Sequence, residues 1–263
     1  MKIVVCIKHV PDVQSERRLE DGRLVRGEDD VLNELDENAV EAAVSLVEDL
    51  GGEVIALTMG PEDAEDGLRR ALQMGADSAV LVSDDELAGS DVVTTARTLA
   101  AAIRRVGGVE PGEEGLGDGD LVITGMASLD AMTSMLPGAL AAALRVPALT
   151  LATGIEVEGA DSLTVTRAVG TTREVLTAPT PALVSVTDQA NEPRYPNFAA
   201  MRAAKKKPID FWDASELGLQ IADPAVAVVD DEARPAREAG IIRTDAGEAG
   251  RELAAWLVEN KLA

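Results

Sequence analysis

The chain has 263 residues, of which 46% are hydrophobic and only 2% aromatic, so a full core has to be built from Val, Leu, Ala and Ile. Its 47 acidic and 24 basic residues give a formal net charge of −23, which argues against binding nucleic acid over a broad surface. The single cysteine excludes an internal disulfide, and no stretch approaches the roughly 18 apolar residues of a membrane span.

The same features predict where the protein resides. The N-terminal run MKIVVCIKHV lacks a signal-peptide cleavage pattern, and the lone Cys6 suits a reducing compartment. We therefore expect a soluble, cytoplasmic protein without membrane insertion. The acidic balance favours a halophilic cytoplasm, although any acidic soluble protein would show it.

Strand and helix patterns alternate along most of the chain. Continuous apolar runs predict buried parallel strands at residues 3–7, 53–58, 78–82, 120–124 and 182–186. Apolar residues spaced by three and four predict helices at 36–50 (capped by Asn33 or Asp36), 62–74, 90–106 (capped by Ser90) and 132–144. Apolar residues that recur at every second position predict antiparallel strands between 155 and 176. Residues 19–26 are typical of a small hairpin, and the polar segment 107–119 is typical of a solvated loop.

This alternation predicts an α/β fold with a doubly wound, mostly parallel sheet, an antiparallel hairpin and an extended C-terminal arm. The last 50 or so residues lack enough apolar surface for a core of their own. They predict one helical turn at 211–219, a short strand at 226–229 and a helix at 247–262. We therefore divide the chain into a domain of residues 1–210 and an arm of residues 211–263, which lies on its own domain or on a partner.

The segment from Gly125 to Leu136 is the best candidate for ligand binding. Ligands of an open parallel sheet bind beyond the carboxyl ends of its strands. This segment joins a strand to a helix there, so free backbone N–H groups can hold a phosphate, helped by the hydroxyls of Ser128, Thr133 and Ser134. Glycine-rich dinucleotide and P-loop fingerprints are absent from the sequence, and the only histidine, His9, lacks partners for a zinc site. The sequence therefore predicts a nucleotide-sized crevice without a catalytic constellation or a metal site.

The loop after the last predicted parallel strand is one that an α/β domain does not need. Pro193 and Pro196 remove two backbone donors and stiffen it. Phe198 and Met201 follow one helical turn apart, and the lysines 205–207 come next. Apolar side chains beside a cationic cluster on a stiff loop suit docking to another protein. The alternative is that Phe198 and Met201 pack onto their own domain.

These residues carry a resemblance to a known family. The run NEPRY at 191–195, with Met201 and the lysines 205–207, resembles the recognition loop of the small (beta) subunit of electron transfer flavoprotein. The pattern from Val5 to Asp12, NELDE at 33–37 and MGAD at 74–77 support it in the same order, so the resemblance covers roughly residues 1–220.

The resemblance implies an electron carrier subunit without catalytic residues of its own, in an adenine nucleotide alpha hydrolase-like fold. The alpha (large) subunit would hold the redox FAD, and this chain would shield that flavin. It would dock acyl-CoA and related dehydrogenases, as in fatty acid oxidation, and relay electrons towards the quinone pool through a quinone oxidoreductase. In the common form of the family a structural AMP fills the crevice of the small subunit, and in the electron-bifurcating form a second FAD does.

The family's functional residues, carried onto this chain, form two groups. Nucleotide contacts would come from Cys6, Asn33, Glu34, Leu35, Asp36, Met59, Gly125, Met126, Ala127, Ser128, Leu129, Asp130, Ala131, Met132, Thr133, Ser134, Met135 and Leu136. Partner docking would involve Asn191, Glu192, Pro193, Arg194, Tyr195, Phe198, Met201, Lys205, Lys206 and Lys207, with Phe198 as the apolar anchor.

The nucleotide segment departs from the family pattern. Met126 and Ala127 replace a basic–Gln pair, Met132 replaces an acid and Met135 replaces a Gln, whereas Gly125 and Asp130 remain. Met and Ala lack the amide donors of Gln, so the main chain has to hold the nucleotide, and we expect AMP here and not a second FAD. The alternative function is a stand-alone adenine-nucleotide-sensing module, which would not need the docking loop. A nucleotidyl transferase would need phosphate-activating residues that the sequence lacks.

Overall fold

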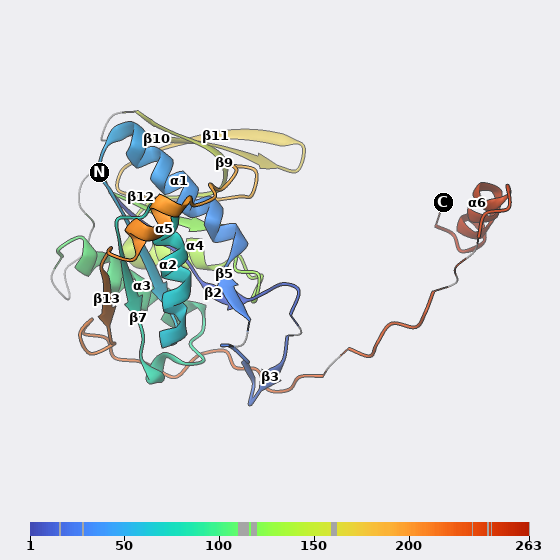
Figure 1. The fold of residues 1–263 in the computed structure, drawn as a ribbon, viewed down its shortest axis with the longest axis horizontal. Coiled ribbons are helices and arrows are strands. Elements are labelled where there is room, and N and C mark those ends of the chain that lie inside the picture. Colours follow the sequence, from blue (N-terminus) through green and yellow to red (C-terminus); the bar gives the residue numbers. More distant parts are fainter. Residues whose placement is uncertain are drawn as a thin grey trace. The chain divides into compact units, whose positions relative to one another are not determined.

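The computed structural model describes residues 1–262 except 16, 28, 110–115, 117–119, 159–161, 233, 241 and 243. The chain divides into two compact units, Met1–Val229 and Asp230–Ala263 (Figure 1). The solvated loop expected at 107–119 lies largely outside the described residues.

A nine-stranded sheet forms the centre of the first unit. Its strands lie in the order β11-β10-β9-β12-β8-β1-β6-β7-β13. Six neighbouring strands pair in parallel, and all but the last of them were predicted from the sequence: β12 (Ala182–Val186), β8 (Leu121–Gly125), β1 (Lys2–Cys6), β6 (Glu53–Met59), β7 (Ser78–Val82) and β13 (Ile209–Trp212). β9 (Ala148–Glu158) runs parallel to β12, and β10 (Ser162–Val169) and β11 (Thr172–Pro179) continue the sheet with antiparallel pairing. The predicted fold class, an α/β fold with a mostly parallel sheet and an antiparallel hairpin, is confirmed.

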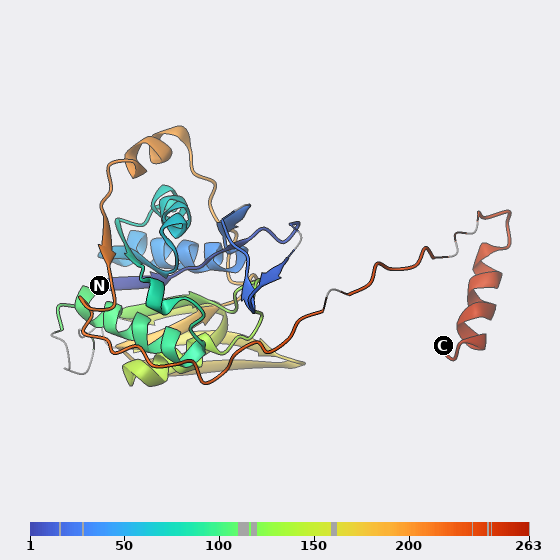
Figure 2. The ribbon, with the colours of Figure 1, turned by 90° about the horizontal axis from the view of Figure 1, so that it is seen from below.

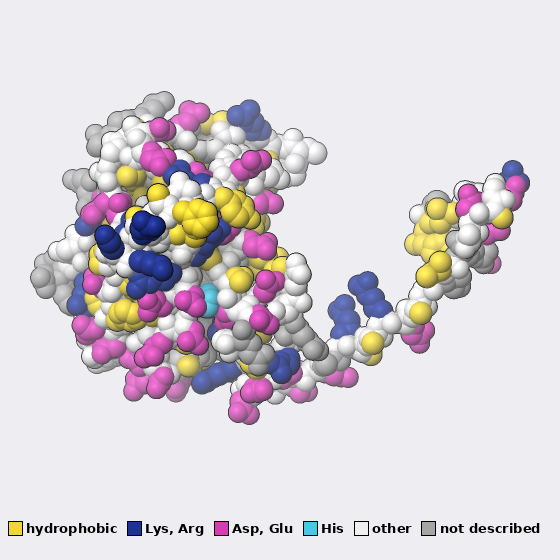
Figure 3. Space-filling view, viewed as in Figure 1, with side chains coloured by type: hydrophobic (Ala, Val, Ile, Leu, Met, Phe, Trp, Pro, Cys, Tyr) yellow, Lys and Arg dark blue, Asp and Glu magenta, His cyan; other side chains and the backbone are white. Residues whose placement is uncertain are grey.

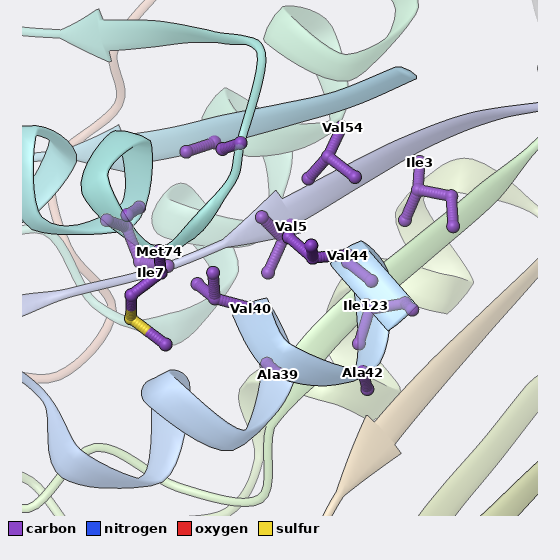
Figure 4. Close-up of a cluster of buried hydrophobic side chains, with 14 of the residues drawn as sticks. Ile3, Val5, Ile7, Ala39, Val40, Ala42, Val44, Val54, Met74 and Ile123 are labelled. Carbon is purple, nitrogen blue, oxygen red and sulfur yellow. The ribbon is translucent and has the colours of Figure 1, made fainter. Parts of the chain in front are cut away.

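Helices cover both faces of this sheet, because the parallel strands are apolar on both sides. α1 (Glu34–Leu50) and α2 (Glu65–Met74, preceded by a 3-10 turn at Glu62–Ala64) lie on one face, and α3 (Val92–Val106) and α4 (Leu136–Leu144) lie on the other (Figure 2). In the first layer, the fully buried Val5 of β1 points toward Val40 and Val44 of α1 (Figure 4). α5 (Phe198–Ala204) packs on the outside of α2. β2 (His9–Pro11) pairs antiparallel with β5 (Asp30–Leu32). β3 (Leu19–Glu20) pairs antiparallel with β4 (Arg23–Leu24), and this pair is the small hairpin that the sequence predicted.

Several predicted boundaries differ from the structure for local reasons. α3 is capped by Asp91, whose side chain accepts a hydrogen bond from the Thr94 N–H, and not by Ser90. α4 begins at Leu136 and not at residue 132, because Met132 and Ser134 have φ angles of 53° and 51°, which no helix accommodates.

The region after residue 208 also differs from the sequence prediction. Residues 209–212 form the edge strand β13, and the helical turn expected at 211–219 is reduced to a turn closed by the Leu219 N–H to Ala214 carbonyl bond. The segment 226–229 is not a strand, and its three valines are largely exposed because no neighbouring strand pairs with it. The first unit therefore continues past residue 210, where the arm was expected to begin, to Val229.

The second unit contains α6 (Ala249–Glu259), within the range predicted from the sequence. Leu253, Trp256 and Val258 on this helix are about half or more exposed, and none of its described residues is buried. The described residues of this unit therefore form no core of their own, as its composition indicated.

Candidate functional site

Asn33 precedes α1 in the cap position, but its side chain does not cap the helix. Its Nδ2 donates to the carbonyl O of Ala127 at 2.9 Å, and its Oδ1 accepts from the N–H of Leu129 at 3.0 Å. Because Asn33 is fully buried, these two bonds satisfy both ends of its amide. The side chain therefore fixes the turn after β8 against the start of α1.

The buried carboxylate of Asp36 joins the ends of β1 and β8 to α1. Its Oδ2 accepts a hydrogen bond from the Lys8 N–H at 2.8 Å, and the backbone N–H of Gly125 faces the same carboxylate. An added Cβ at Gly125 would contact Asp36 Oδ1 and would lie 2.8 Å from the carbonyl O of Leu35. Glycine is needed at this position because the backbone approaches α1 too closely for a side chain.

Burial raises the pKa of Asp36 to about 7, although hydrogen bonds from Asn33 and from the backbone of Lys8 and Gly125 oppose this rise. The neighbouring Cys6 is buried and free of disulfides. Its own burial and the nearby Asp36 raise the pKa of the thiol to about 12. Cys6 is therefore a protonated thiol, and a poor nucleophile, at the end of β1 at neutral pH.

Asp130 ties the same turn to the N-terminal segment. Lys8 Nζ lies 3.0 Å from Oδ1 and 2.8 Å from Oδ2 of Asp130, and Arg26 also pairs with Oδ2. Arg26 in addition donates from Nη1 to the carbonyl O of His9 at 3.0 Å. Burial alone would raise the pKa of Asp130, but Lys8 and Arg26 lower it to about 2, so this carboxylate is anionic at neutral pH. Neither Lys8 nor Arg26 was among the nucleotide contacts predicted from the sequence.

The segment that follows Asp130 lies at the surface. Residues 131–135 are all exposed, and the N–H of Met132 returns to the carbonyl O of Ser128 at 2.8 Å. The hydroxyls of Thr133 and Ser134 are therefore open to solvent at the start of α4. The structure thus divides the predicted nucleotide segment into a packed part, 125–130, and an exposed part, 131–135.

The other residues predicted to contact a nucleotide lie around this cluster. Leu35 and Met59 are half-buried at the start of α1 and the end of β6, and Glu34 is exposed. His9 is buried, with its Nδ1 4.0 Å from Asp30 Oδ2. Among the described residues, no group of three or more His, Cys, Asp or Glu side chains is arranged to hold a metal ion.

The predicted docking loop is held on α1 by Arg194. Its Nε and Nη2 donate to the two carboxylate oxygens of Glu41 at 2.8 and 3.0 Å, and its Nη1 and Nη2 donate to those of Glu48 at 2.6 and 3.0 Å. The N–H of Arg194 also donates to Glu41 Oε2 at 3.0 Å. Desolvation would raise the pKa of Glu41, but Arg194 lowers it, and Arg194 likewise lowers the pKa of Glu48. Two bidentate pairs fix both the position and the orientation of this guanidinium.

A second contact holds the loop three residues earlier. Asn38 Nδ2 donates to the carbonyl O of Asn191 at 2.9 Å, and Asn191 Nδ2 donates back to the carbonyl O of Asn38 at 3.0 Å. Asn38 is buried, so its amide is committed to this exchange. The loop is therefore attached to α1 at both Asn191 and Arg194.

The aromatic side chains of the loop point into solvent. Phe198 is 88% exposed and Tyr195 is 91% exposed, whereas Met201 is half-buried. The Asn197 side chain caps α5 by accepting from the N–H of Ala200 at 2.9 Å, which fixes Phe198 at the first position of the helix. Figure 3 shows hydrophobic side chains beside basic ones over the α5–α2 part of the surface. Phe198 therefore does not pack onto its own domain.

The three predicted docking lysines have different environments. Lys205 and Lys206 are exposed. Lys207 Nζ donates to the carbonyl oxygens of Leu72 and Ala76 at 3.2 and 2.5 Å, at the C-terminal end of α2. Burial lowers the pKa of Lys207. Lys207 therefore stabilises the helix end and is not a free charge on the loop.

Comparison with known proteins decides the family. The family model of the electron transfer flavoprotein domain matches residues 21–217. The chain is 38% identical over 273 residues to the electron transfer flavoprotein subunit beta of Mycobacterium leprae, covering 99% of this chain and 98% of that protein. The chain belongs to the electron transfer flavoprotein family.

More distant members show the same relationship. The chain is 35% identical over 219 residues to the electron transfer flavoprotein subunit beta of Megasphaera elsdenii, covering 82% of this chain and 79% of that protein. It is also 35% identical over 223 residues to the caffeyl-CoA reductase-Etf complex subunit CarD of Acetobacterium woodii, covering 83% and 80%. The resemblance to the beta subunit of electron transfer flavoprotein is confirmed, and with it an association with flavin-dependent electron transport. Among the described residues, no helix is both long and apolar enough to span a bilayer.

The Asp36→Asn substitution tests the buried carboxylate. Asn keeps the shape and an acceptor for the Lys8 N–H but does not titrate. The pKa of Asp36 is about 7 in the folded chain against an ordinary value of 3.8, so between these values the folded state binds more protons than the unfolded state. As pH rises through this window, the wild-type chain should therefore lose stability relative to Asp36→Asn, by up to about 4 kcal/mol.

Urea unfolding of both proteins between about pH 4 and about pH 8 measures this difference, with the exposed Asp188→Asn as the matched control. Parallel stability curves for wild type and Asp36→Asn would contradict the raised pKa.

Proposed function

We propose that this chain is the small subunit of a heterodimeric electron transfer flavoprotein. It pairs with an alpha subunit that holds the redox FAD, and it shields one side of that flavin. Support comes from the beta-subunit relative that matches over 99% of the chain. The second unit, with its exposed Leu253 and Trp256, is the proposed arm that contacts the alpha subunit.

The proposed role is to dock electron donors and not to transform a substrate. The observation that carries it is Phe198, which is 88% exposed on a loop that Arg194 and Asn191 attach to α1. A pre-ordered apolar side chain loses little entropy when it enters a partner's pocket. Cys6 is kept as a thiol and Asp130 is neutralised by two cations, so neither is a nucleophile or base in this account.

We propose acyl-CoA and related dehydrogenases as the electron donors and the quinone pool, through a quinone oxidoreductase, as the destination. The relative from Acetobacterium woodii is named as part of a complex with caffeyl-CoA reductase, which supports an enzyme of CoA esters as the partner. FAD supplies the electron-carrying ring when bound. This chain's own part is to hold the donor while the flavin approaches. The proposed location is the cytoplasm, where a free thiol such as Cys6 stays reduced.

We also propose that the predicted crevice, at the ends of β1, β6 and β8, holds AMP. The donors proposed to bind its phosphate are the hydroxyls of Thr133 and Ser134 in the exposed turn, which follows Asp130, the residue that pairs with the cations Lys8 and Arg26. Asn33 and Asp36 position this turn without having to touch the nucleotide.

The Phe198→Ala substitution should lower the efficiency of electron transfer from an acyl-CoA dehydrogenase to the purified heterodimer about tenfold, because truncating a central aromatic anchor removes most of its contact area. Flavin reduction followed by absorbance measures the rate. The flavin content per heterodimer should not change, since Phe198 lies at the surface. Val93→Ala, an exposed apolar residue on α3, is the control. A wild-type rate for Phe198→Ala would contradict the docking role of this loop.

Nucleotides released by denaturing the purified heterodimer should comprise one FAD and one AMP for each complex, identified by mass spectrometry. One FAD without AMP would refute the AMP site. Two FAD molecules would show that the crevice holds a flavin instead.

A further inference from the structure

Two of the seven methionines differ from the others in their exposure. Met132 is 62% exposed and Met135 is 58% exposed. The other five are half-buried or buried: Met1, Met59, Met74, Met126 and Met201. Since an oxidant in solution reacts with the thioethers that it can reach, Met132 and Met135 are the methionines that it meets most readily.

The turn that carries these two methionines leaves them uncovered. The N–H of Met132 bonds to the carbonyl O of Ser128 at 2.8 Å and closes the base of the turn, while residues 131–135 are all exposed. Met132 and Ser134 have φ angles of 53° and 51°, so α4 begins only at Leu136. The turn therefore lacks the neighbours one helical turn away that would pack against its side chains.

The single cysteine does not compete for an oxidant. Cys6 is buried and remains a protonated thiol at neutral pH. Peroxides react with the thiolate, and they need access to the sulfur, so Cys6 reacts slowly on both counts. A response of this chain to peroxide through its sulfur atoms therefore falls on methionine.

The reaction of a methionine with hydrogen peroxide needs no other reactant. The thioether sulfur attacks one peroxide oxygen, so that an S–O bond forms as the O–O bond breaks. The departing hydroxide takes up the proton of the transferred hydroxyl and leaves as water. Sulfur is oxidised by two electrons and the peroxide is reduced by two. The product, a sulfoxide, is polar, and its oxygen is a better hydrogen-bond acceptor than the thioether sulfur.

The two sulfurs flank the hydroxyls that are proposed to bind the AMP phosphate. Thr133 and Ser134 lie between Met132 and Met135 in the sequence, and all four residues are exposed on the same turn. A sulfoxide oxygen on either methionine is a neighbouring acceptor for these hydroxyls. It would therefore compete with a phosphate for the same donors.

We propose that Met132 and Met135 form a modification site at which hydrogen peroxide, by oxidising them to sulfoxides, releases AMP from the turn 131–135. This inference rests on the proposed AMP site and adds a means of regulating it. Methionine sulfoxide reductases reduce both epimers of the sulfoxide, so the change is reversible. The electron carrier would then sense peroxide through its nucleotide turn and not through a cysteine.

The test treats the purified heterodimer with hydrogen peroxide, locates the added oxygen by peptide mass spectrometry and measures AMP binding by equilibrium dialysis. Met132 and Met135 should gain oxygen at least about threefold faster than the half-buried Met126 and Met201. Oxidation should raise the AMP dissociation constant at least about fivefold, which corresponds to the loss of a hydrogen bond. Methionine sulfoxide reductases A and B with a thiol reductant should restore it.

A double variant, Met132→Leu with Met135→Leu, keeps apolar side chains of similar size but has no sulfur in the turn. Peroxide should leave its AMP dissociation constant within about twofold of its own untreated value. Met201→Leu removes a methionine outside the turn and is the matched control. Its AMP dissociation constant should rise on oxidation as that of the wild type does.

Oxidation of Met132 and Met135 no faster than that of Met126 and Met201 would overturn this inference and leave the proposed function standing. An unchanged AMP dissociation constant in the oxidised wild type would do the same. Loss of AMP from the peroxide-treated double variant would assign the sensitivity to another residue and overturn the inference. A heterodimer that binds no AMP before treatment would refute the proposed nucleotide and this inference with it.

Discussion

Hydrogen bonds between α1 and two loops distant in sequence fix the parts of the surface that are proposed to bind other molecules. At the start of the helix, Asn33 and Asp36 hold the turn after β8. Further along it, Asn38, Glu41 and Glu48 hold the loop that begins at residue 191. The buried amides and carboxylates among them have to be paired, so folding of α1 onto the sheet commits both loops to their places.

In this arrangement, the residues that fix the two loops differ from the residues that are exposed on them. The residues that fix the loops are Asn33, Asp36, Asn38 and Arg194, and all of them lie inside or against the domain. The groups proposed to meet ligands and partners lie at the exposed turn 131–135 and at the exposed rings of Tyr195 and Phe198. In the proposed electron-carrier role, such a subunit contributes by placing other molecules at a fixed distance from one another and needs no catalytic group of its own.

Much of the fold could be predicted from the sequence, because buried parallel strands and amphipathic helices have different apolar periods. The runs at 3–7, 53–58 and 182–186 form β1, β6 and β12, and the NEPRY motif at 191–195 lies on the loop that Asn191 and Arg194 attach to α1. Apolar pattern does not reveal hydrogen-bond partners, however. The sequence predicted Asn33 as a helix cap, but its side-chain amide bonds to the backbone of Ala127 and Leu129. It predicted Lys207 as a docking charge, but the Lys207 ammonium bonds to the end of α2. The pairing of Arg26 could not be predicted from local sequence patterns, because its partner Asp130 lies 104 residues away in the chain.

Amide hydrogen exchange of residues 188–204 in the chain alone tests most directly whether α1 orders the docking loop before any partner binds. The account predicts that the Arg194 amide, which donates to Glu41 Oε2, is protected in the wild type and loses this protection in Arg194→Gln. The exposed Arg202→Gln on α5 is the matched control and should leave the protection unchanged. Exchange of the Arg194 amide at the unfolded rate in the wild type, or unchanged protection in Arg194→Gln, would contradict the claim that this contact holds the loop.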